Sequence, residues 1–305
     1  MNKYLDKCRL CPRNCSVNRN NNEVGFCMAT NALKLAKAYL HKWEEPCISG
    51  NVGSGTIFFS YCNLKCIYCQ NYDISTLNNG ELISVNRLKE ICLELQEKGA
   101  LNINLVTPTH YVPLIVEALK LAKKEGLNIP IVYNTSSYEN VDTIKMLNGI
   151  VDVYLPDLKY YDDSYAIKYS NAKKYFKYAS MAIDEMYKQV GKCTFDKDGI
   201  IKKGVIVRHL MLPKHIEDSK KVIEYLYNKY KNNIYISIMN QYTPLRKLEY
   251  KSLNEKVTDL EYNNLIDYAY DLGIRNAFVQ EGETQKESFI PLFDGEGIIK
   301  KSNIN

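Results

Sequence analysis

Long apolar runs are absent from this 305-residue sequence, and none approaches the roughly 18–20 residues that a membrane-spanning helix needs. The first residues, Met1 to Lys7, are charged and lack the apolar core of a signal peptide. A concentrated basic segment is also missing, because the 40 Lys and Arg residues are scattered among the 35 Asp and Glu residues. These absences argue against a membrane protein and a nucleic-acid-binding protein, and we expect a cytoplasmic location.

Cysteine, by contrast, is abundant, and its distribution is informative. Ten cysteines are many for a cytosolic protein, in which disulfides are rare. Seven of them fall into two tight groups, one of four and one of three: Cys8, Cys11, Cys15 and Cys27, then Cys62, Cys66 and Cys69. In a reducing compartment such groups more often hold metal than form disulfides.

From residue 56 onward, apolar stretches of strand length alternate with amphipathic stretches of helix length. Strands are predicted over 56–61, 102–107, 131–134, 151–155, 205–208, 234–239 and 277–279. Helices are predicted over about 86–99, 111–125, 170–190, 217–231 and 258–271, with a short one ending near 149. Such alternation implies parallel strands joined by right-handed crossovers. Six or seven units are too few for a closed eight-fold barrel, so we expect an α/β fold with an incomplete, open barrel.

Three regions follow from this pattern. Residues 1–50 are expected to form a Cys-rich, metal-binding extension with one helix around 29–39. Residues 51–280 are expected to form the barrel, and 281–305 a C-terminal tail. Ligands of parallel α/β folds bind at the carboxyl ends of the strands. Polar residues of chemical interest lie at those predicted ends: Cys62, Thr107, Asn134, Asp157, Arg208 and Gln241.

The group of three cysteines has the spacing C-x3-C-x2-C and follows the first barrel strand directly. Three thiolates on one loop can bind three irons of a [4Fe–4S] cluster, which leaves the fourth iron open to another ligand. Zinc is an alternative, although it more often uses paired C-x2-C or mixed histidine ligands. Three buried cysteines without metal are the structural alternative.

This loop resembles the signature of the radical S-adenosylmethionine (SAM) superfamily, whose fold is a partial (β/α)6 barrel. Its context, Gly53-Ser54-Gly55-Thr56-Ile57-Phe58-Phe59 through Cys69-Gln70-Asn71, resembles an uncharacterised branch related to pyruvate formate-lyase activating enzyme. The resemblance extends over nearly the whole chain, including the segment from Cys8 to Cys15. It implies an oxidoreductase whose [4Fe–4S] cluster at Cys62, Cys66 and Cys69 cleaves SAM reductively.

The resemblance also implies which residues contact SAM. Tyr68 corresponds to an aromatic residue near the adenine. A glycine-rich Gly-Gly-Glu segment usually binds the SAM amine after the second strand, but this chain has Thr107-Pro108-Thr109-His110 there. The predicted SAM-binding residues are therefore Tyr68, Thr107, Asn134, Thr135, Asp157, Lys159 and Arg208. Plain packing of Tyr68 and a solvated turn at Asp157 and Lys159 are the alternatives, whereas Arg208 inside an apolar strand needs an anionic partner.

The first cysteine group, C-x2-C-x3-C-x11-C, supplies four thiolates at Cys8, Cys11, Cys15 and Cys27. A zinc knuckle and a second [4Fe–4S] cluster both fit that number of ligands.

The resemblance favours a glycyl-radical activase, which abstracts hydrogen from a backbone glycine of a partner enzyme. One alternative is modification of a small molecule or peptide, assisted by the N-terminal metal site. Another is an iron–sulfur or electron-transfer protein without SAM chemistry. The expected partners are a glycyl-radical enzyme or another protein or peptide substrate, and an electron donor such as flavodoxin or ferredoxin.

Overall fold

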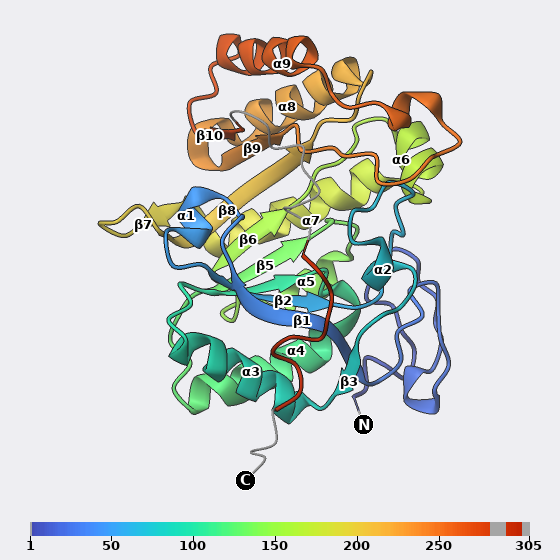
Figure 1. Cartoon of the computed structure of the whole chain (residues 1–305), viewed down its shortest axis with the longest axis vertical. Helices are drawn as coiled ribbons and strands as arrows, with labels where there is room; N and C mark the ends of the chain where they lie inside the picture. The colour runs from blue at the N-terminus through green and yellow to red at the C-terminus, as the bar shows by residue number, and fades with distance from the viewer. Residues whose placement is uncertain (1, 281–290, 301–305) are drawn as a thin grey trace.

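The computed structural model describes residues 2–280 and 291–300. Its centre is a sheet in which neighbouring strands run parallel from β2 to β10 (Figure 1). In spatial order these strands are β2 (Ser54–Phe59), β4 (Ile103–Val106), β5 (Ile131–Thr135), β6 (Val153–Pro156), β8 (Ile201–Leu210), β9 (Tyr235–Met239) and β10 (Ala277–Val279). Three further strands pair antiparallel: β1 (Leu33–His41) with β2, β3 (Glu81–Ile83) with β1, and β7 (Thr194–Phe195) with β8.

Helices connect the parallel strands and cover the sheet. The longer ones are α3 (Val85–Glu97), α4 (Val112–Lys124), α6 (Asp163–Ser170), α7 (Tyr175–Val190), α8 (Ile216–Tyr230) and α9 (Asp259–Asp271). The short ones are α1 (Pro46–Ser49), α2 (Tyr72–Ser75) and α5 (Val141–Lys145). In Figure 1, α3 and α4 lie toward one end of the row of strands, and α8 and α9 lie toward the other. Within the described residues, β3 and β10 end the sheet without pairing to each other, so the predicted open barrel is confirmed.

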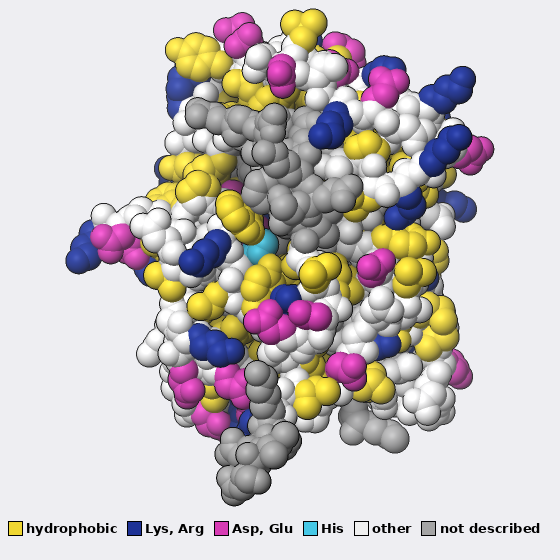
Figure 2. All heavy atoms as spheres, in the orientation of Figure 1, with side chains coloured by type: hydrophobic (Ala, Val, Ile, Leu, Met, Phe, Trp, Pro, Cys, Tyr) yellow, Lys and Arg dark blue, Asp and Glu magenta, His cyan; other side chains and the backbone are white. Residues whose placement is uncertain are grey.

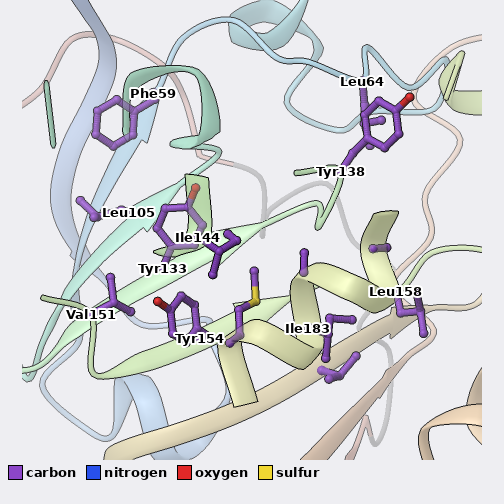
Figure 3. Packing of buried hydrophobic residues seen from close by; sticks show 14 of the residues in the cluster. Phe59, Leu64, Leu105, Tyr133, Tyr138, Ile144, Val151, Tyr154, Leu158 and Ile183 are labelled. Atoms are coloured by element: carbon purple, nitrogen blue, oxygen red, sulfur yellow. The ribbon is translucent and has the colours of Figure 1, made fainter. Parts of the chain in front are cut away.

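The core lies between the parallel strands and the helices that follow them. Residues of β4, β5 and β6 are buried on both faces, as expected of strands covered by crossover helices. Figure 3 shows Tyr133 of β5 beside Tyr154 of β6, with the side chain of Ile144 next to Tyr133. The two tyrosine rings meet edge to face, with centroids 6.0 Å apart. Strands fixed in this way hold their carboxyl ends, and the residues that follow them, in one place.

The prediction of a helix around 29–39 is wrong, because this segment forms β1. Leu33 and Leu35 pack into the main core, whereas Ala36 faces a smaller cluster on the other side of the strand. Lys37 is buried and pairs with Asp294 and Glu296, each at 3.0 Å. A strand covered on both faces carries apolar residues without strict alternation, and a short run of that kind is easily confused with a helix.

Two other expectations change in detail. The helix predicted over 170–190 begins later, at Tyr175 of α7, because a separate helix, α6, ends at Ser170 and is capped by Asn171, whose backbone is left-handed with φ 51°. The predicted tail of 281–305 lies partly outside the described residues. Its described part, 291–300, runs along β1, where Gly295 N donates to Ala36 O and Ala38 N donates to Glu296 O.

Surface features agree with the composition. Lysine and arginine side chains alternate with acidic ones on the face shown in Figure 2, without a large patch of one sign. No helix in the described part of the chain combines the length and the apolar character needed to cross a bilayer.

Residues 1–50 contribute β1 to the main sheet, and the division of the chain at residue 50 remains a prediction.

Candidate active site

The loop that carries Cys62, Cys66 and Cys69 begins directly after β2. Its backbone turns sharply, and the two non-glycine residues Tyr61 and Lys65 have positive φ values of 73° and 59°. Such conformations are uncommon outside glycine and persist where the surroundings impose them. The turns direct the three cysteines toward one cavity at the carboxyl ends of the strands.

Each of the three sulfurs accepts a hydrogen bond. Leu64 N donates to Cys62 Sγ over 3.3 Å, Ser170 Oγ donates to Cys66 Sγ over 2.9 Å, and Ser75 Oγ donates to Cys69 Sγ over 3.5 Å. Donors of this kind stabilise thiolate ligands and tune the potential of an iron–sulfur cluster. The sulfur environment therefore fits a metal-bound thiolate.

Burial raises the pKa of Cys66 to about 12, although the nearby Lys159 ammonium lowers it. The pKa of Cys62 is also raised by burial, and a backbone hydrogen bond from Lys65 opposes that shift. Thiols with raised pKa values keep their protons at neutral pH unless a metal displaces them. Cluster assembly at this loop must therefore release protons.

The cavity beside the loop has a volume of about 180 Å³. It is lined by the three cysteines and by every residue that the sequence predicted to contact SAM: Tyr68, Thr107, Asn134, Thr135, Asp157, Lys159 and Arg208. These residues come from the cysteine loop and from the ends of β4, β5, β6 and β8. The parallel topology thus gathers them at one edge of the sheet.

A charged network crosses one wall of this cavity. Arg208 donates from Nε to Asp157 Oδ1 over 3.0 Å, from Nη1 to Glu44 Oε2 over 3.2 Å, and from Nη2 to Asn134 Oδ1 over 2.5 Å. Lys159 Nζ donates to the other oxygen of Asp157 over 2.6 Å. The anionic partner that Arg208 requires is thus supplied within the chain by Asp157 and Glu44.

This pairing determines the charges of the network. Burial opposes the ionisation of Asp157, but Lys159 and Arg208 outweigh it and lower the pKa of that carboxyl. Burial alone would lower the pKa values of Lys159 and Arg208, but the negative charge of Asp157 outweighs burial and raises both pKa values. All three groups are therefore charged at neutral pH and present fixed dipoles to the cavity.

Thr107 is the first residue after β4 and begins the segment Thr107-Pro108-Thr109-His110. It has φ 59°, which is unusual for a β-branched residue, and its N–H donates to Asn134 O over 2.9 Å. Nearby, the buried Glu139 accepts hydrogen bonds from Thr135 Oγ1, from Thr109 Oγ1 at 3.1 Å and from Tyr133 OH at 2.9 Å. Burial raises the pKa of Glu139 to about 7. One carboxyl group therefore ties the ends of β4 and β5 together behind the cavity wall.

Tyr68 belongs to the cysteine loop, between Cys66 and Cys69, and lines the cavity. Its hydroxyl is 2.6 Å from that of Tyr160, which in turn lies 2.7 Å from Ser170 Oγ, the donor to Cys66. Its ring meets that of Tyr242 edge to face, at 5.9 Å between centroids. The aromatic position is thus fixed by contacts on both sides.

Several residues of the site were not found from the sequence. Glu44 comes from the segment before α1 and pairs with the distant Arg208, whereas Ser170 ends α6 and donates to the distant Cys66. Glu139 lies in the loop after β5 and has no recognisable pattern around it. Short, isolated polar residues in connecting segments give no periodic signal, so only the assembled fold reveals them.

The four N-terminal cysteines also come together. Cys8, Cys11, Cys15 and Cys27 line a small cavity of about 20 Å³, together with Arg13, Arg19 and His110. Burial, with a smaller contribution from the other three thiols, raises the pKa of Cys11 to about 12. The described residues include no three His, Cys, Asp or Glu side chains arranged to hold a single metal ion, and this applies to both cysteine groups.

Comparison with known proteins agrees with this geometry. The chain is 31% identical over 272 residues to an uncharacterised protein, MJ0674, of Methanocaldococcus jannaschii, which covers 86% of this chain and 74% of the relative. It is 26% identical over 233 residues to the pyruvate formate-lyase-activating enzyme of Clostridium pasteurianum, covering 73% of this chain and 90% of that enzyme.

Among solved structures, HydG, a maturase of the [FeFe]-hydrogenase, superposes with a TM-score of 0.51 at 15% identity. The match covers 75% of this chain and 52% of HydG, so the chain spans about half the length of that protein. At this identity the likeness supports the fold alone. The profile of the Radical SAM superfamily matches residues 56–243, which include the cysteine loop, most of β2, and β3 through β9. The chain therefore belongs to the radical SAM superfamily, a family of enzymes that bind a [4Fe–4S] cluster and SAM.

Proposed function

We propose that this protein abstracts a hydrogen atom from a protein or peptide substrate, as a glycyl-radical activase does. The observation that carries the proposal is the cavity in which three hydrogen-bonded cysteine sulfurs face a charged wall of Asp157, Lys159 and Arg208. Similarity to a pyruvate formate-lyase-activating enzyme over 73% of the chain supports the choice of substrate.

The residues of the cavity have distinct parts in this reaction. Cys62, Cys66 and Cys69 would hold three irons of the cluster and would leave one iron open to SAM. A cluster bound there would supply the single electron that reductive cleavage of SAM requires. Arg208 and Lys159, both held by Asp157, lie on the cavity wall where they would orient the carboxylate and ribose of SAM.

The remaining contacts position the other end of SAM. Tyr68 packs against the adenine, because its ring is held in place by Tyr160 and Tyr242. Thr107, Asn134 and Thr135 supply the polar groups that replace the missing Gly-Gly-Glu segment. The backbone of Thr107 has a positive φ, and this conformation turns the chain out of the direction of β4 and toward the cavity.

A neighbouring cavity of about 270 Å³ provides room for the substrate. It shares Asn134, Arg208 and Gln241 with the SAM cavity, and His41 and Phe58 form part of its other wall. A substrate there lies directly beside the bound SAM, as hydrogen abstraction requires.

Anaerobic reconstitution with iron and sulfide, followed by dithionite and SAM, tests the proposal. Mass spectrometry should detect 5′-deoxyadenosine, and a glycyl-radical enzyme added as substrate should acquire a glycyl radical visible by electron paramagnetic resonance (EPR). Absence of 5′-deoxyadenosine from a preparation with a full cluster contradicts SAM cleavage. Formation of 5′-deoxyadenosine without a glycyl radical on any candidate partner contradicts the activase role.

A second candidate is modification of a small molecule or peptide with help from the N-terminal metal site. The contact of that site with the cysteine loop favours it, since Arg13, which lines the N-terminal cavity, donates to Asn63 O over 3.0 Å. A gene for a glycyl-radical enzyme beside this one favours the activase, and its absence favours this second candidate.

The N-terminal cysteines are proposed to hold a second [4Fe–4S] cluster or zinc. The proposed electron donor is a flavodoxin or ferredoxin in the cytoplasm, where thiols remain reduced.

A further inference from the structure

A further cavity, of about 100 Å³, lies beside the cavity proposed for the substrate. The two cavities share Trp43, Glu44, Arg208, Gln241 and Gln280. The smaller one is also lined by Glu45 and Pro46 at the start of α1, by Ser237 and Met239 of β9, and by Phe278 and Val279 of β10. A substrate in the larger cavity can therefore extend one group into the smaller one.

Glu45 is a buried carboxyl whose hydrogen bonds are incomplete. The residue is 8% exposed, and its Oε2 has no hydrogen-bond partner among the described residues. It occupies the N-cap position of α1, but its side chain makes no capping hydrogen bond to that helix. Burial of a carboxyl oxygen without a partner is unfavourable. Glu45 thus marks a place where a bound group would supply the missing partner.

The charges around this cavity leave Glu45 as the surplus acid. Arg208 and Lys159 carry two positive charges, and ion pairs join them to the two negative charges of Asp157 and Glu44. Burial raises the pKa of Glu45 and so does the charge of Glu44, whereas Arg208 opposes both. A further positive charge beside Glu45 would favour its ionised form, and a ligand can bring that charge.

The walls of the cavity suit an organic cation. Trp43 and Phe278 line it, and aromatic rings attract a neighbouring cation. An ammonium group is similar in size to a water molecule, which occupies about 30 Å³ in the liquid. The cavity therefore has room for an ammonium group and for part of the carbon chain that carries it.

A metal ion fits these walls less well. Hard cations such as Ca²⁺ take six to eight oxygen ligands. The two oxygens of Glu44 already accept hydrogen bonds, from Asn104 Nδ2 over 3.0 Å and from Arg208 Nη1 over 3.2 Å. One remaining carboxylate beside aromatic and aliphatic side chains supplies too few oxygens.

We propose that this cavity binds a primary ammonium group of the substrate, with Glu45 as its counter-ion, and so selects substrates that carry an amine. A lysine side chain and the N-terminal amino group of a peptide share this chemistry. The inference deepens the proposed function and rests on it for the assignment of the larger cavity to the substrate. An amine fixed at Glu45 would hold the adjoining part of the substrate in the larger cavity, next to the SAM site.

The first test compares probes with and without an amine. Trp43 is the single tryptophan of the chain and lines both cavities, so its fluorescence should report binding. The reconstituted protein, saturated with SAM and kept without reductant, is titrated with Nα-acetyl-lysine methylamide, norleucine methylamide and Nα-acetyl-norleucine methylamide. These probes carry a side-chain amine, an N-terminal amine and no amine, respectively.

At least one amine probe should bind about tenfold more tightly than the neutral probe, as expected of a charged hydrogen bond. The amine probe with the higher affinity identifies the source of the ammonium group. Affinities of both amine probes no higher than that of the neutral probe overturn the proposal.

The second test removes the charge of Glu45. Glu45→Gln keeps the shape of the side chain, so the neutral probe should bind as it does to the wild type, whereas the preference for an amine should disappear. Glu117→Gln is the control, because Glu117 is exposed on α4 and lines neither cavity, and it should keep the preference. A preserved preference in Glu45→Gln, or an equal loss of affinity for charged and neutral probes, overturns the role of Glu45 as counter-ion.

These titrations require no SAM cleavage, so they separate this inference from the proposed function. An amine preference in a protein that forms no 5′-deoxyadenosine supports the amine site and contradicts the proposed function. Formation of 5′-deoxyadenosine by a protein without an amine preference contradicts the amine site alone.

Discussion

Arg208 donates its Nε hydrogen to Asp157 Oδ1 over 3.0 Å, while Lys159 donates to the other oxygen of the same carboxylate. One carboxylate at the end of β6 thus holds two cations from different parts of the chain. Because the three groups are buried, removing any one leaves an uncompensated charge, which costs several kcal/mol in typical proteins. The network therefore fixes the cavity wall before SAM arrives.

Replacing Arg208 with lysine should weaken SAM binding by about tenfold, or about 1.4 kcal/mol. Lysine keeps the positive charge but cannot contact Asp157, Glu44 and Asn134 together, so the remaining cation points less well at SAM. Equilibrium binding of SAM to the reconstituted variant measures the effect, and cluster absorbance should match the wild type. Unchanged SAM affinity would assign Arg208 to the ion pair alone.

Alanine at any one of Cys62, Cys66 and Cys69 should abolish 5′-deoxyadenosine formation, because two thiolates cannot hold the cluster with one open iron. Iron analysis should show loss of the SAM cluster. Cys92→Ala is the matched control, since Cys92 is fully buried in α3 away from the cavity. That control should retain SAM cleavage and lose only about 1 kcal/mol of stability. SAM cleavage by the triple cysteine variant would disprove the assignment of the loop.

Much of this site was predictable because its signals are local. The cysteine spacing lies within eight residues, and each apolar strand is a short run that ends next to a polar residue. Parallel topology then requires that these ends meet, so Asp157 and Arg208 were expected together. Their direct ion pair was not expected, because the positions of two charged residues in the sequence do not determine the orientations of their side chains in the fold.

Other residues depend on contacts that no local pattern encodes. Glu44 reaches Arg208 across 164 positions of sequence, and Ser170 reaches Cys66 across 104. A charged residue such as Lys37 argues against a strand that is buried on both faces, and β1 was therefore mistaken for a helix. In the fold Lys37 is buried because Asp294 and Glu296, from the described part of the tail, pair with it. Such long-range burial decides the local structure, and the sequence of the segment alone does not contain it.

Glu139 should make stability depend on pH. Its pKa is raised to about 7 in the folded protein, so folding favours the protonated form. The contribution is complete below the unfolded pKa of about 4.5 and is lost as the pH rises through 7, with about 1 kcal/mol lost between pH 6 and 8. In Glu139→Gln that loss should disappear. Melting temperatures of both proteins across this range test the prediction, and parallel curves would contradict it.

Ser170 should tune the SAM cluster without binding SAM. Its hydroxyl donates to Cys66 Sγ over 2.9 Å, and such a bond favours the reduced, more negative state of a cluster. Ser170→Ala should therefore lower the midpoint potential of the SAM cluster and slow 5′-deoxyadenosine formation when the reductant is weak. Ser164→Ala, an exposed change in the same helix α6, is the control and should leave the potential unchanged. Redox titration followed by EPR measures both variants. If both potentials equal that of the wild type, the bond from Ser170 serves only to hold α6 against the cysteine loop.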